Sequence, residues 1–332
     1  MSSGREELRG PVLRSVSRSF YLSLRFLPKA LRDPLSLAYL LARATDTLAD
    51  TAEAPVPLRA EALRTLSTAI QGAVSSEATV PLRESFAPLQ KNEAERALIS
   101  RLPELLEWLG ELPVADRDEI RSVLVKINRG QTLDLERFDP STSTTTSIKA
   151  LRTGAELDEY TYLVAGCVGE FWTRLCFAHV KNFSGRSEEE MRELGTRYGK
   201  GLQLINILRD TGDDLRQGRC YLPADELQSL GLAPGEILRD PTRIEPILKN
   251  WRQKAEEGME AGIDYTASIR NRRVRFATAL PALIGARTLA LLRDVRSDAL
   301  RRKVKVPRPE VRKLIVSSML ASPRSLRRIA DL

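Results

Sequence analysis

The feature that most constrains the fold is a long apolar helix pattern that ends in carboxylates. Residues 33–50, DPLSLAYLLARATDTLAD, place leucine and alanine at the spacing of a helix that is buried on most sides. Tyr39, Arg43, Asp46 and Asp50 follow at steps of four, three and four, so they share one helix face. A polar line on an apolar helix needs partners for its charges, so we expect this face to border a functional site.

A second helix repeats the arrangement. Gln203, Asn206, Asp210 and Asp214 step by three, four and four residues, and Asp213 stands beside them. Leucine and isoleucine flank this polar line as well. Like charges one turn apart repel, and burial makes each carboxylate harder to ionise, so we expect a cation between the acids.

Mg²⁺ suits these groups, because it takes a few carboxylate oxygens together with water and substrate phosphate oxygens. We expect the two stripes to face each other across a cavity and to hold Mg²⁺ and a diphosphate. The ions would stabilise the departing diphosphate, and apolar walls would keep water from the carbocation. The pattern predicts ionisation of an allylic prenyl diphosphate, with these metal ligands: Asp46, Asp50, Asp210, Asp213 and Asp214.

The alternative is surface salt bridging, in which Arg43, Arg209 and Arg216 neutralise the acids. A single motif of two aspartates four residues apart is common by chance and supports either interpretation. Two such motifs, with Gln203 and Asn206 aligned on the second, favour the metal site.

The rest of the chain indicates the fold class. Leucine, alanine, arginine and glutamate dominate, β-branched alternation is scarce, and no repeat or long linker divides the sequence. We therefore expect one all-α domain over residues 1–332, with a polar loop at 141–147. Asp33 is the expected N-cap of the first acidic helix, with Pro34 in its first turn.

Composition limits the partners. A net charge of +8 suits an anionic partner, namely nucleic acid, a membrane surface or a phosphorylated substrate. Aromatic residues are only 5% and the basic residues are scattered, so we expect no nucleic-acid partner. The three cysteines (Cys167, Cys176, Cys220) form no CxxC pair and indicate reduced thiols, and the single histidine, His179, lies in an apolar helical pattern typical of a structural residue.

The sequence predicts a cytoplasmic protein without a transmembrane anchor. The N-terminus has no apolar signal region, and the most apolar run, 276–292, is broken by Pro281 and Arg287. A lipidic substrate makes peripheral contact with the inner face of a membrane plausible, through the basic segments 272–276 and 324–332. The oligomeric state is left open.

Four segments resemble the squalene/phytoene synthases, the head-to-head prenyl transferases. They are SRSFYLSLRFLP (17–28), AYLLARATDTLADT (38–51), EYTYLVAGCVG (159–169) and GLQLINILRDTGDDLRQGRCYLP (201–223). They cover most of the chain in the family's order, and the last is highly specific. The resemblance implies a single all-α isoprenoid-synthase domain, a helical bundle around a central cavity.

The resemblance also implies residue roles. The family's two aspartate-rich motifs match Asp46–Asp50 and Asp210–Asp214, which makes these acids catalytic as well as metal-binding, and its central-helix tyrosine, implicated in the first half-reaction, matches Tyr160. Without the resemblance, Tyr160 reads as a core tyrosine. Substrate-binding roles fall on Ser17, Arg18, Ser19, Phe20, Tyr39, Arg43, Gln203, Asn206 and Arg209. Gly166 and Gly169 either open a groove for a prenyl chain or allow close helix packing.

Two details favour squalene synthase, which condenses two farnesyl diphosphates to presqualene diphosphate and reduces that with NADPH. The first motif reads Asp-Thr-x-x-Asp, and VKVPR (304–308) resembles a segment whose lysine is associated with NADPH or phosphate. Lys305 and Arg308 are therefore the expected cofactor-binding residues, with a solvated basic loop as the alternative. Residues 206–223 resemble the phytoene synthase version as well as bacterial squalene synthases. A phytoene or dehydrosqualene synthase without reductant, or a dedicated presqualene diphosphate synthase, therefore stays open.

Other protein classes fit the sequence less well. An inactive relative that serves in assembly should have lost the carboxylates, and all five are present. A head-to-tail prenyl transferase or a terpene cyclase would normally show a DDxxD motif, which this sequence lacks.

Overall fold

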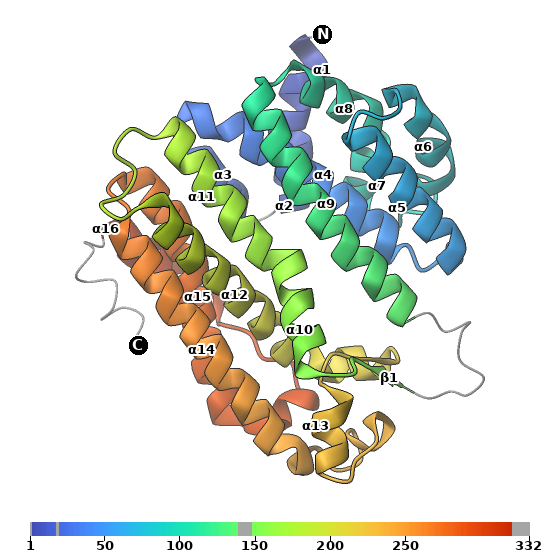
Figure 1. Cartoon of the computed structure of the whole chain (residues 1–332), viewed down its shortest axis with the longest axis vertical. Helices are drawn as coiled ribbons and strands as arrows, with labels where there is room; N and C mark the ends of the chain where they lie inside the picture. Colours follow the sequence, from blue (N-terminus) through green and yellow to red (C-terminus); the bar gives the residue numbers. More distant parts are fainter. Residues whose placement is uncertain (1, 18–19, 139–147, 321–332) are drawn as a thin grey trace. The chain divides into compact units, whose positions relative to one another are not determined.

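The structure, a computed structural model, describes residues 2–17, 20–138 and 148–320 (Figure 1). Within these ranges the chain is helical almost throughout. The strands found there are two short segments, β1 (Lys149–Ala150) and β2 (Arg219–Cys220), which pair in parallel with Lys149 opposite Arg219. The prediction of an all-α protein is confirmed. The predicted loop at 141–147 lies outside the described residues.

The chain divides into two compact units. The first comprises Met1–Leu135 and Arg174–Lys181, and the second comprises Glu136–Thr173 and Asn182–Leu332. This division does not test the expectation of one domain, which stays a prediction.

The first unit is built from short helices and two long ones. Its elements are α1 (Ser2–Glu7), η1 (Leu8–Val12), α2 (Leu13–Ser17), α3 (Phe20–Phe26), α4 (Lys29–Asp50), α5 (Val56–Ile70), η2 (Ser76–Thr79), α6 (Val80–Phe86), α7 (Glu93–Ile99), α8 (Leu102–Glu111), most of α9 (Val114–Arg137) and the end of α11 (Cys167–His179). The buried leucines of α4 form the middle of this unit's core.

Helix α4 begins a turn earlier than its sequence indicates. Its N-cap is Pro28, so the prediction of Asp33 as the N-cap is wrong, and Pro34 lies inside the helix. The physical reason is packing: Leu31 is fully buried, which extends the apolar face upstream. Asp33 instead accepts a hydrogen bond from Arg9.

The second unit contains longer helices. Its elements are β1, α10 (Gly154–Thr161), η4 (Tyr162–Gly166), the first part of α11 (Cys167–His179), α12 (Glu188–Arg216), β2, α13 (Ala224–Ser229), η5 (Pro234–Glu236), η6 (Pro241–Ile244), α14 (Glu245–Ser268), α15 (Arg272–Val295), η7 (Arg296–Leu300) and α16 (Arg308–Leu320). A π-helical turn, η4, lies between α10 and α11. Such turns often occur at functional sites.

Helix α12 matches its sequence signals closely. Ser187 caps its start, and the Ser187 and Glu190 side chains each bond the other's backbone N–H in a capping box. The helix ends at Arg216, and Gly218 follows with φ +82°, a left-handed conformation that glycine adopts at little cost.

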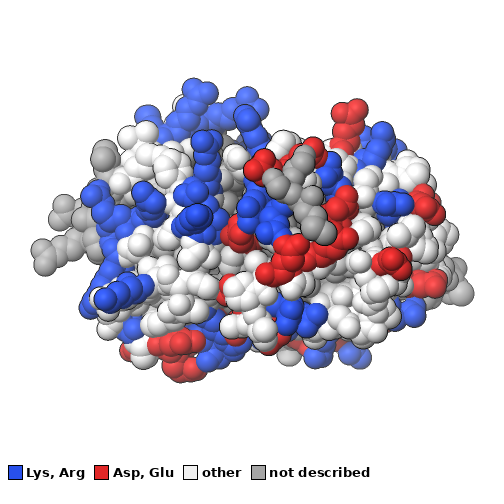
Figure 2. All heavy atoms as spheres, turned by 90° about the horizontal axis from the view of Figure 1, so that it is seen from above, with Lys and Arg blue, Asp and Glu red and all other residues white. Residues whose placement is uncertain are grey.

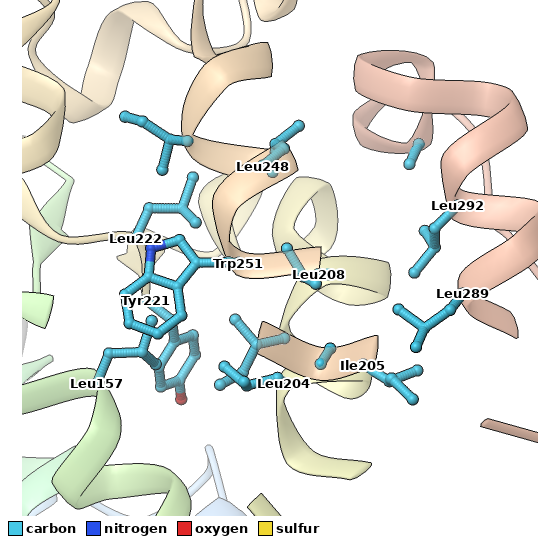
Figure 3. Packing of buried hydrophobic residues seen from close by; sticks show 14 of the residues in the cluster. Leu157, Leu204, Ile205, Leu208, Tyr221, Leu222, Leu248, Trp251, Leu289 and Leu292 are labelled. Carbon is cyan, nitrogen blue, oxygen red and sulfur yellow. The ribbon is translucent and has the colours of Figure 1, made fainter. Parts of the chain in front are cut away.

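Helices α12, α14 and α15 share the core of the second unit (Figure 3). Leu204 and Leu208 of α12 lie in one cluster with Trp251 of α14 and Leu289 of α15. Glycine allows α12 and α14 to approach closely: a Cβ added at Gly201 would lie 2.8 Å from the Cα of Gly258. Burying a leucine side chain stabilises a fold by about 1.5–3 kcal/mol, so this three-helix cluster is a firm support for the acids on α12.

One helix in the described part of the chain is long and apolar enough, by composition, to cross a membrane. It covers Arg272–Leu300, and 61% of its most apolar window is buried within the structure. A mostly buried core helix of a soluble protein passes the same test, so this helix is weak evidence for a span.

The three cysteines and the single histidine have the surroundings of structural residues. Cys167, Cys176 and Cys220 are buried and free of disulfides. In the first unit, Nε2 of His179 lies 2.6 Å from Oδ1 of Asp116, which is buried at the start of α9. This pair links two helices and includes none of the predicted site residues.

Candidate active site

The polar stripe on α4 is the least buried side of that helix. Leu40, Leu41 and Leu48, on its other sides, are completely buried. Asp46 and Asp50, on the stripe, keep contact with solvent. The predicted geometry of apolar flanks and a polar line is therefore present in the first unit.

Arg43 connects the stripe to α7. Its Nη1 donates to Asp46 at 2.6 Å, and its Nη2 donates to Glu95 at 2.5 Å. Desolvation by neighbouring atoms, followed by the negative charge of Asp50, raises the pKa of Asp46 to about 6, and Arg43 opposes the shift. Because 41% of the Asp46 side chain is exposed, water moderates this effect. Even with an arginine in contact, the carboxylate is less readily ionised than usual.

Tyr39 ties α4 to the segment that resembles the family's Ser-Arg-Ser-Phe sequence. Its hydroxyl donates to the carbonyl of Val16 at 3.2 Å, one residue before the buried Ser17, whose own hydroxyl donates to Leu13. Arg18 and Ser19 lie outside the described residues. Phe20 is the first residue of α3. Tyr39 thus holds the backbone that leads into this segment.

In the second unit, the stripe on α12 begins with two amides. Nδ2 of Asn206 lies 3.4 Å from Oε1 of Gln203. Farther along, Arg209 grips Asp210 through two donors, Nε at 2.9 Å and Nη2 at 2.5 Å. This bidentate pair is the strongest charge compensation on α12.

Asp214 is the most enclosed acid of this stripe. Its side chain is 18% exposed, and the closest atom of Arg219 lies 3.9 Å away. Burial is the largest cause that raises its pKa to about 6; Asp210 and Asp213 add to the shift, and Arg219 opposes it. The second unit therefore contains a carboxylate whose negative charge is poorly compensated by its own neighbours.

Asp213 differs from the other acids. Its side chain is half exposed and bonds Arg216 at 2.6 Å, and this hydrogen bond holds its pKa below the usual range. The charge of Lys303 acts in the same direction. Asp213 is thus already stabilised as a carboxylate.

The arginine partners expected by the salt-bridge alternative are all present. Arg43, Arg209 and Arg216 each contact one of the acids. Two of the carboxylates, Asp46 and Asp214, nevertheless have raised pKa values, so this pairing leaves negative charge incompletely compensated. Carboxylate oxygens are the ligands Mg²⁺ prefers, and it binds readily through only one or two of them plus substrate phosphates.

The acids occur as separate groups. In the described ranges, no three histidine, cysteine, aspartate or glutamate side chains converge to make a complete metal site. The donor set in each unit fits a metal that is completed by water and substrate oxygens better than an all-protein cage.

Tyr160 lies in an aromatic stack just before the π-helical turn. Its ring stacks on Tyr221 with centroids 5.1 Å apart and planes at 27°, and Tyr221 also meets Phe138 edge-on at 5.1 Å. Tyr160 is buried. This stack fixes the plane of the ring, which suits either a positioned catalytic hydroxyl or a core residue.

For Gly169, the structure decides between groove and packing. A Cβ at Gly169 would lie 2.0 Å from the carbonyl oxygen of Gly195, and one at Gly199 would lie 2.3 Å from that of Ala165. A Cβ at Gly166 would meet the Lys200 side chain at 3.0 Å. These glycines allow α12 to pack closely on η4 and α11, so the packing alternative holds at Gly169.

The two predicted cofactor residues lie on an exposed edge of the second unit. Lys305 and Arg308 are exposed, while Val304 and Val306 are buried. The valines anchor the segment between η7 and α16 and leave the basic side chains in solvent. This arrangement suits contact with a phosphate and equally a solvated basic loop.

Sequence reasoning missed three residues that shape these stripes. Glu95 shares Arg43 with Asp46, Arg219 lies beside Asp214, and Tyr221 supports the ring of Tyr160. Tyr221 and Arg219 stand in the family-like segment 201–223 and could have been singled out there. Glu95 carries no local signal, because its role depends on a contact between α4 and α7.

Comparison with known proteins identifies the family. The family model for squalene/phytoene synthase matches residues 13–310. A bifunctional lycopene cyclase/phytoene synthase from Phaeosphaeria nodorum is 30% identical over 73% of this chain and 38% of its own length. A squalene synthase from Saccharomyces cerevisiae is 27% identical over 64% of this chain and 44% of its own length. The chain thus spans less than half the length of these two relatives.

A solved structure shows the fold. The complex of TcSQS with the ligand E5700 superposes with a TM-score of 0.76 over 98% of this chain and 89% of that chain, at 22% identity. The all-α isoprenoid-synthase fold is therefore confirmed. With the family model matching most of its length, the chain belongs to the squalene/phytoene synthase family of prenyltransferases.

Proposed function

We propose that this protein condenses two farnesyl diphosphates head-to-head to presqualene diphosphate and reduces that product with NADPH to squalene. The observation that carries the proposal is the incomplete compensation of the two acid stripes. Asp46 and Asp214 have raised pKa values although arginines lie beside them. Carboxylates one helical turn apart whose charge is incompletely compensated favour binding of a cation that a diphosphate can share.

The proposed metal is Mg²⁺. Bound there, it would neutralise the diphosphate and so lower the free energy needed to break the carbon–oxygen bond. Asp213 would have to release Arg216 to take part, just as Asp46 and Asp210 would have to release Arg43 and Arg209. The residues proposed to hold the metal are Asp46, Asp50, Asp210, Asp213 and Asp214.

The arginines beside the acids are proposed to bind the diphosphate. Arg43 and Arg209 each hold a guanidinium against an aspartate, and a guanidinium fork also matches two phosphate oxygens. An incoming diphosphate would compete for these guanidinium groups and release the carboxylates. Ser17, Arg18, Ser19, Phe20, Tyr39, Gln203 and Asn206 complete the proposed substrate-binding set.

Tyr160 is proposed to act in the first half-reaction. Its ring is fixed by stacking on Tyr221, so its hydroxyl can be held at one place relative to the reacting carbons. A positioned hydroxyl can orient the substrate or accept the proton that leaves on bond formation. The apolar residues around it would exclude water from the carbocation.

The choice of farnesyl diphosphate and NADPH rests on sequence details. These are the Asp-Thr-x-x-Asp form of the first motif and the resemblance of 304–308 to squalene synthases. The relatives include both squalene and phytoene synthases, so the second candidates are a phytoene or dehydrosqualene synthase and a dedicated presqualene diphosphate synthase. We also propose a cytoplasmic enzyme with peripheral membrane contact.

Product analysis tests the reaction. The protein is incubated with farnesyl diphosphate and Mg²⁺, with and without NADPH, and the lipid products are separated. We expect presqualene diphosphate or dehydrosqualene-type products without NADPH, and squalene with it. Preference for geranylgeranyl diphosphate, with products indifferent to NADPH, would instead identify a phytoene synthase. Release of presqualene diphosphate regardless of NADPH would identify a first-step enzyme.

Lys305→Ala tests the cofactor site. Loss of a charge-assisted hydrogen bond to a cofactor phosphate should raise KM for NADPH about 10- to 100-fold, with formation of presqualene diphosphate little changed. Lys249→Ala removes another exposed lysine, on α14, and should leave KM unchanged. An unaltered KM in Lys305→Ala would favour the solvated basic loop.

A further inference from the structure

A second site candidate lies at the opposite end of α12 from the acids. It is an open pocket of about 450 Å³ whose lining includes Arg186, Arg270 and Arg275. Arg186 immediately precedes the N-cap Ser187, whereas Asp210 lies near the helix C-terminus. At 1.5 Å per residue, the two sites are about 35 Å apart along the helix, so this pocket is separate from the acid stripe.

The pocket is strongly basic. None of its lining residues is acidic. In the part of the chain that the structure describes, no carboxylate lies within 4 Å of these three arginines, whereas Arg43 and Arg209 are each paired with an acid. Arg272 and Arg273, next in the chain, are exposed. Burial, then the charge of Arg272, lowers the pKa of Arg275. Arg186 differs, because its charge also acts on Glu190 in the first turn of α12 and helps to lower the pKa of that carboxyl group.

The backbone around the pocket is well fixed. Ser184 and Ile269 form an antiparallel bridge, and the N–H of Arg270 donates to Phe183 at 2.8 Å. The Nη1 of Arg275 donates to the carbonyl of Ile269 at 2.9 Å. A Cβ at Gly185 would lie 3.2 Å from Nη2 of Arg270, so the glycine leaves room for that guanidinium. The arginines are therefore held close together, although each repels the others.

We propose that this pocket binds the phosphate headgroup of an anionic lipid and docks the protein on a membrane surface. Guanidinium groups bind phosphate oxygens through paired hydrogen bonds, and three of them can surround one phosphate. The pocket is open to solvent and has room for a headgroup. The positive end of the α15 dipole begins beside it at Arg272 and adds to the attraction.

Two features of the surface favour a lipid over a free anion. Figure 2 shows lysine and arginine side chains gathered on the left part of one face of the molecule, with acidic side chains along its lower edge. Helix α16 packs on α15 and exposes Val316 by 58% and Met319 by 43%, apolar side chains that a membrane would accept. The proposal that the bound phosphate belongs to a lipid rests on the proposed function with its lipidic substrate. The proposal that the pocket binds an anion does not rest on that function.

Vesicle binding by the full chain tests the proposal. The protein is sedimented with phosphatidylcholine vesicles that contain or lack phosphatidylglycerol, without substrate or metal. We expect binding that requires phosphatidylglycerol. Each arginine at an anionic surface contributes about fivefold in partitioning, so R186Q/R270Q/R275Q should bind about 100-fold more weakly. R14Q/R64Q/R239Q, which removes three exposed arginines elsewhere, should keep most of the binding.

A double variant and a turnover assay separate a loss of the phosphate site from a loss of the fold. R186Q/R270Q leaves the Arg275 bond to Ile269 intact and should bind about 25-fold more weakly even if the triple variant is unstable. Turnover of soluble substrate by these variants should match the parent, since none of the three arginines belongs to the proposed reaction site. Loss of turnover would therefore contradict the proposed function, and loss of vesicle binding would contradict the proposed lipid site, each without the other.

Three results would overturn the proposal. One is equal binding to vesicles with and without phosphatidylglycerol. Another is a loss of binding in the control variant as large as in R186Q/R270Q. The third is binding of inorganic phosphate, detected by calorimetry and lost in R186Q/R270Q, without vesicle binding, which would show a site for a free anion.

Discussion

The acid stripes of α4 and α12 share a sequence pattern and differ in how their charges are balanced. On α4, one arginine serves two acids, because Arg43 bonds both Asp46 and Glu95. On α12, Arg209 donates two hydrogen bonds to Asp210, whereas the basic group paired with Asp214 within the described residues is Arg219, at 3.9 Å. Asp214 is also less exposed than Asp46, at 18% against 41%.

The comparison shows that residue spacing determines which side chains share a helix face. Residues from other parts of the fold determine how far the negative charge of the aspartates is compensated. Glu95 and Arg219 come from outside the two stripes and change the electrostatics of each. The α12 stripe should therefore depend more on an added cation than the α4 stripe. The predictions below test that comparison.

The largest expected effect is on turnover by acid variants. Asp46→Asn and Asp210→Asn should each lower kcat at least about 10²–10³-fold, because each removes charge that stabilises the departing diphosphate through the bound cation. Product formation from farnesyl diphosphate with Mg²⁺ measures the loss. Asp118→Asn, an exposed acid on α9, is the matched control and should keep full activity.

Thermal melting of the same variants separates function from structure. Without Mg²⁺, both variants should melt at the temperature of the parent or above it, because the substitutions relieve repulsion between carboxylates. A variant that melts much lower and still turns over substrate would assign its aspartate to a structural salt bridge. A loss confined to one stripe would mean that the two stripes do not serve one reaction.

The next effect concerns the aromatic stack of the second unit. Tyr160→Phe keeps the ring on Tyr221 and removes the hydroxyl, so substrate should bind while presqualene diphosphate forms about 10²–10⁴-fold more slowly. Tyr221→Phe preserves the same stack and should slow the step far less. Rapid-quench measurement of the first step gives both rates. An unchanged rate in Tyr160→Phe would leave Tyr160 as a core residue.

A smaller effect tests how the end of α12 is positioned. A Cβ at Gly212 would lie 2.1 Å from the carbonyl oxygen of Leu300, so Gly212→Ala must shift the helix beside Asp213 and Asp214. We expect a loss of about 1–3 kcal/mol in the free energy of unfolding, although alanine favours a helix by about 1 kcal/mol. Urea denaturation measures it.

Gly110→Ala is the matched control for Gly212→Ala. A Cβ at Gly110, inside α8, meets nothing within 4 Å, so this variant should gain up to about 1 kcal/mol. A Gly212→Ala variant as stable as the parent would show that η7 can move away from α12 at little cost in free energy.

The sequence predicted the features that depend on local spacing. The all-α class and the shared face of each acid stripe follow from the helical periodicity of apolar and polar residues. The predicted start of α4 was wrong, because burial of Leu31 extends the helix upstream of Asp33, the N-cap that the local sequence indicates. The roles of Glu95 and Gly169 depend on contacts between helices that are distant in sequence, which no local pattern encodes.

The smallest effect is the pH dependence of stability without metal. The pKa of Asp214 is raised to about 6 in the folded chain from an ordinary value of 3.8, so between these values the folded state binds more protons than the unfolded state. Stability should therefore fall as pH rises through this window and stay low above it.

In EDTA above pH 7, Asp214→Asn should gain on the order of 1–2 kcal/mol in the free energy of unfolding and lose most of this pH dependence. Asp46→Asn should gain less, since Asp46 is more exposed and its removal leaves Arg43 with Glu95 alone. Denaturation at pH 5 and pH 8 in EDTA measures both variants. Equal gains would mean that the two stripes are balanced alike, and a loss in Asp214→Asn would mean that Arg219 stabilises its carboxylate more than burial destabilises it.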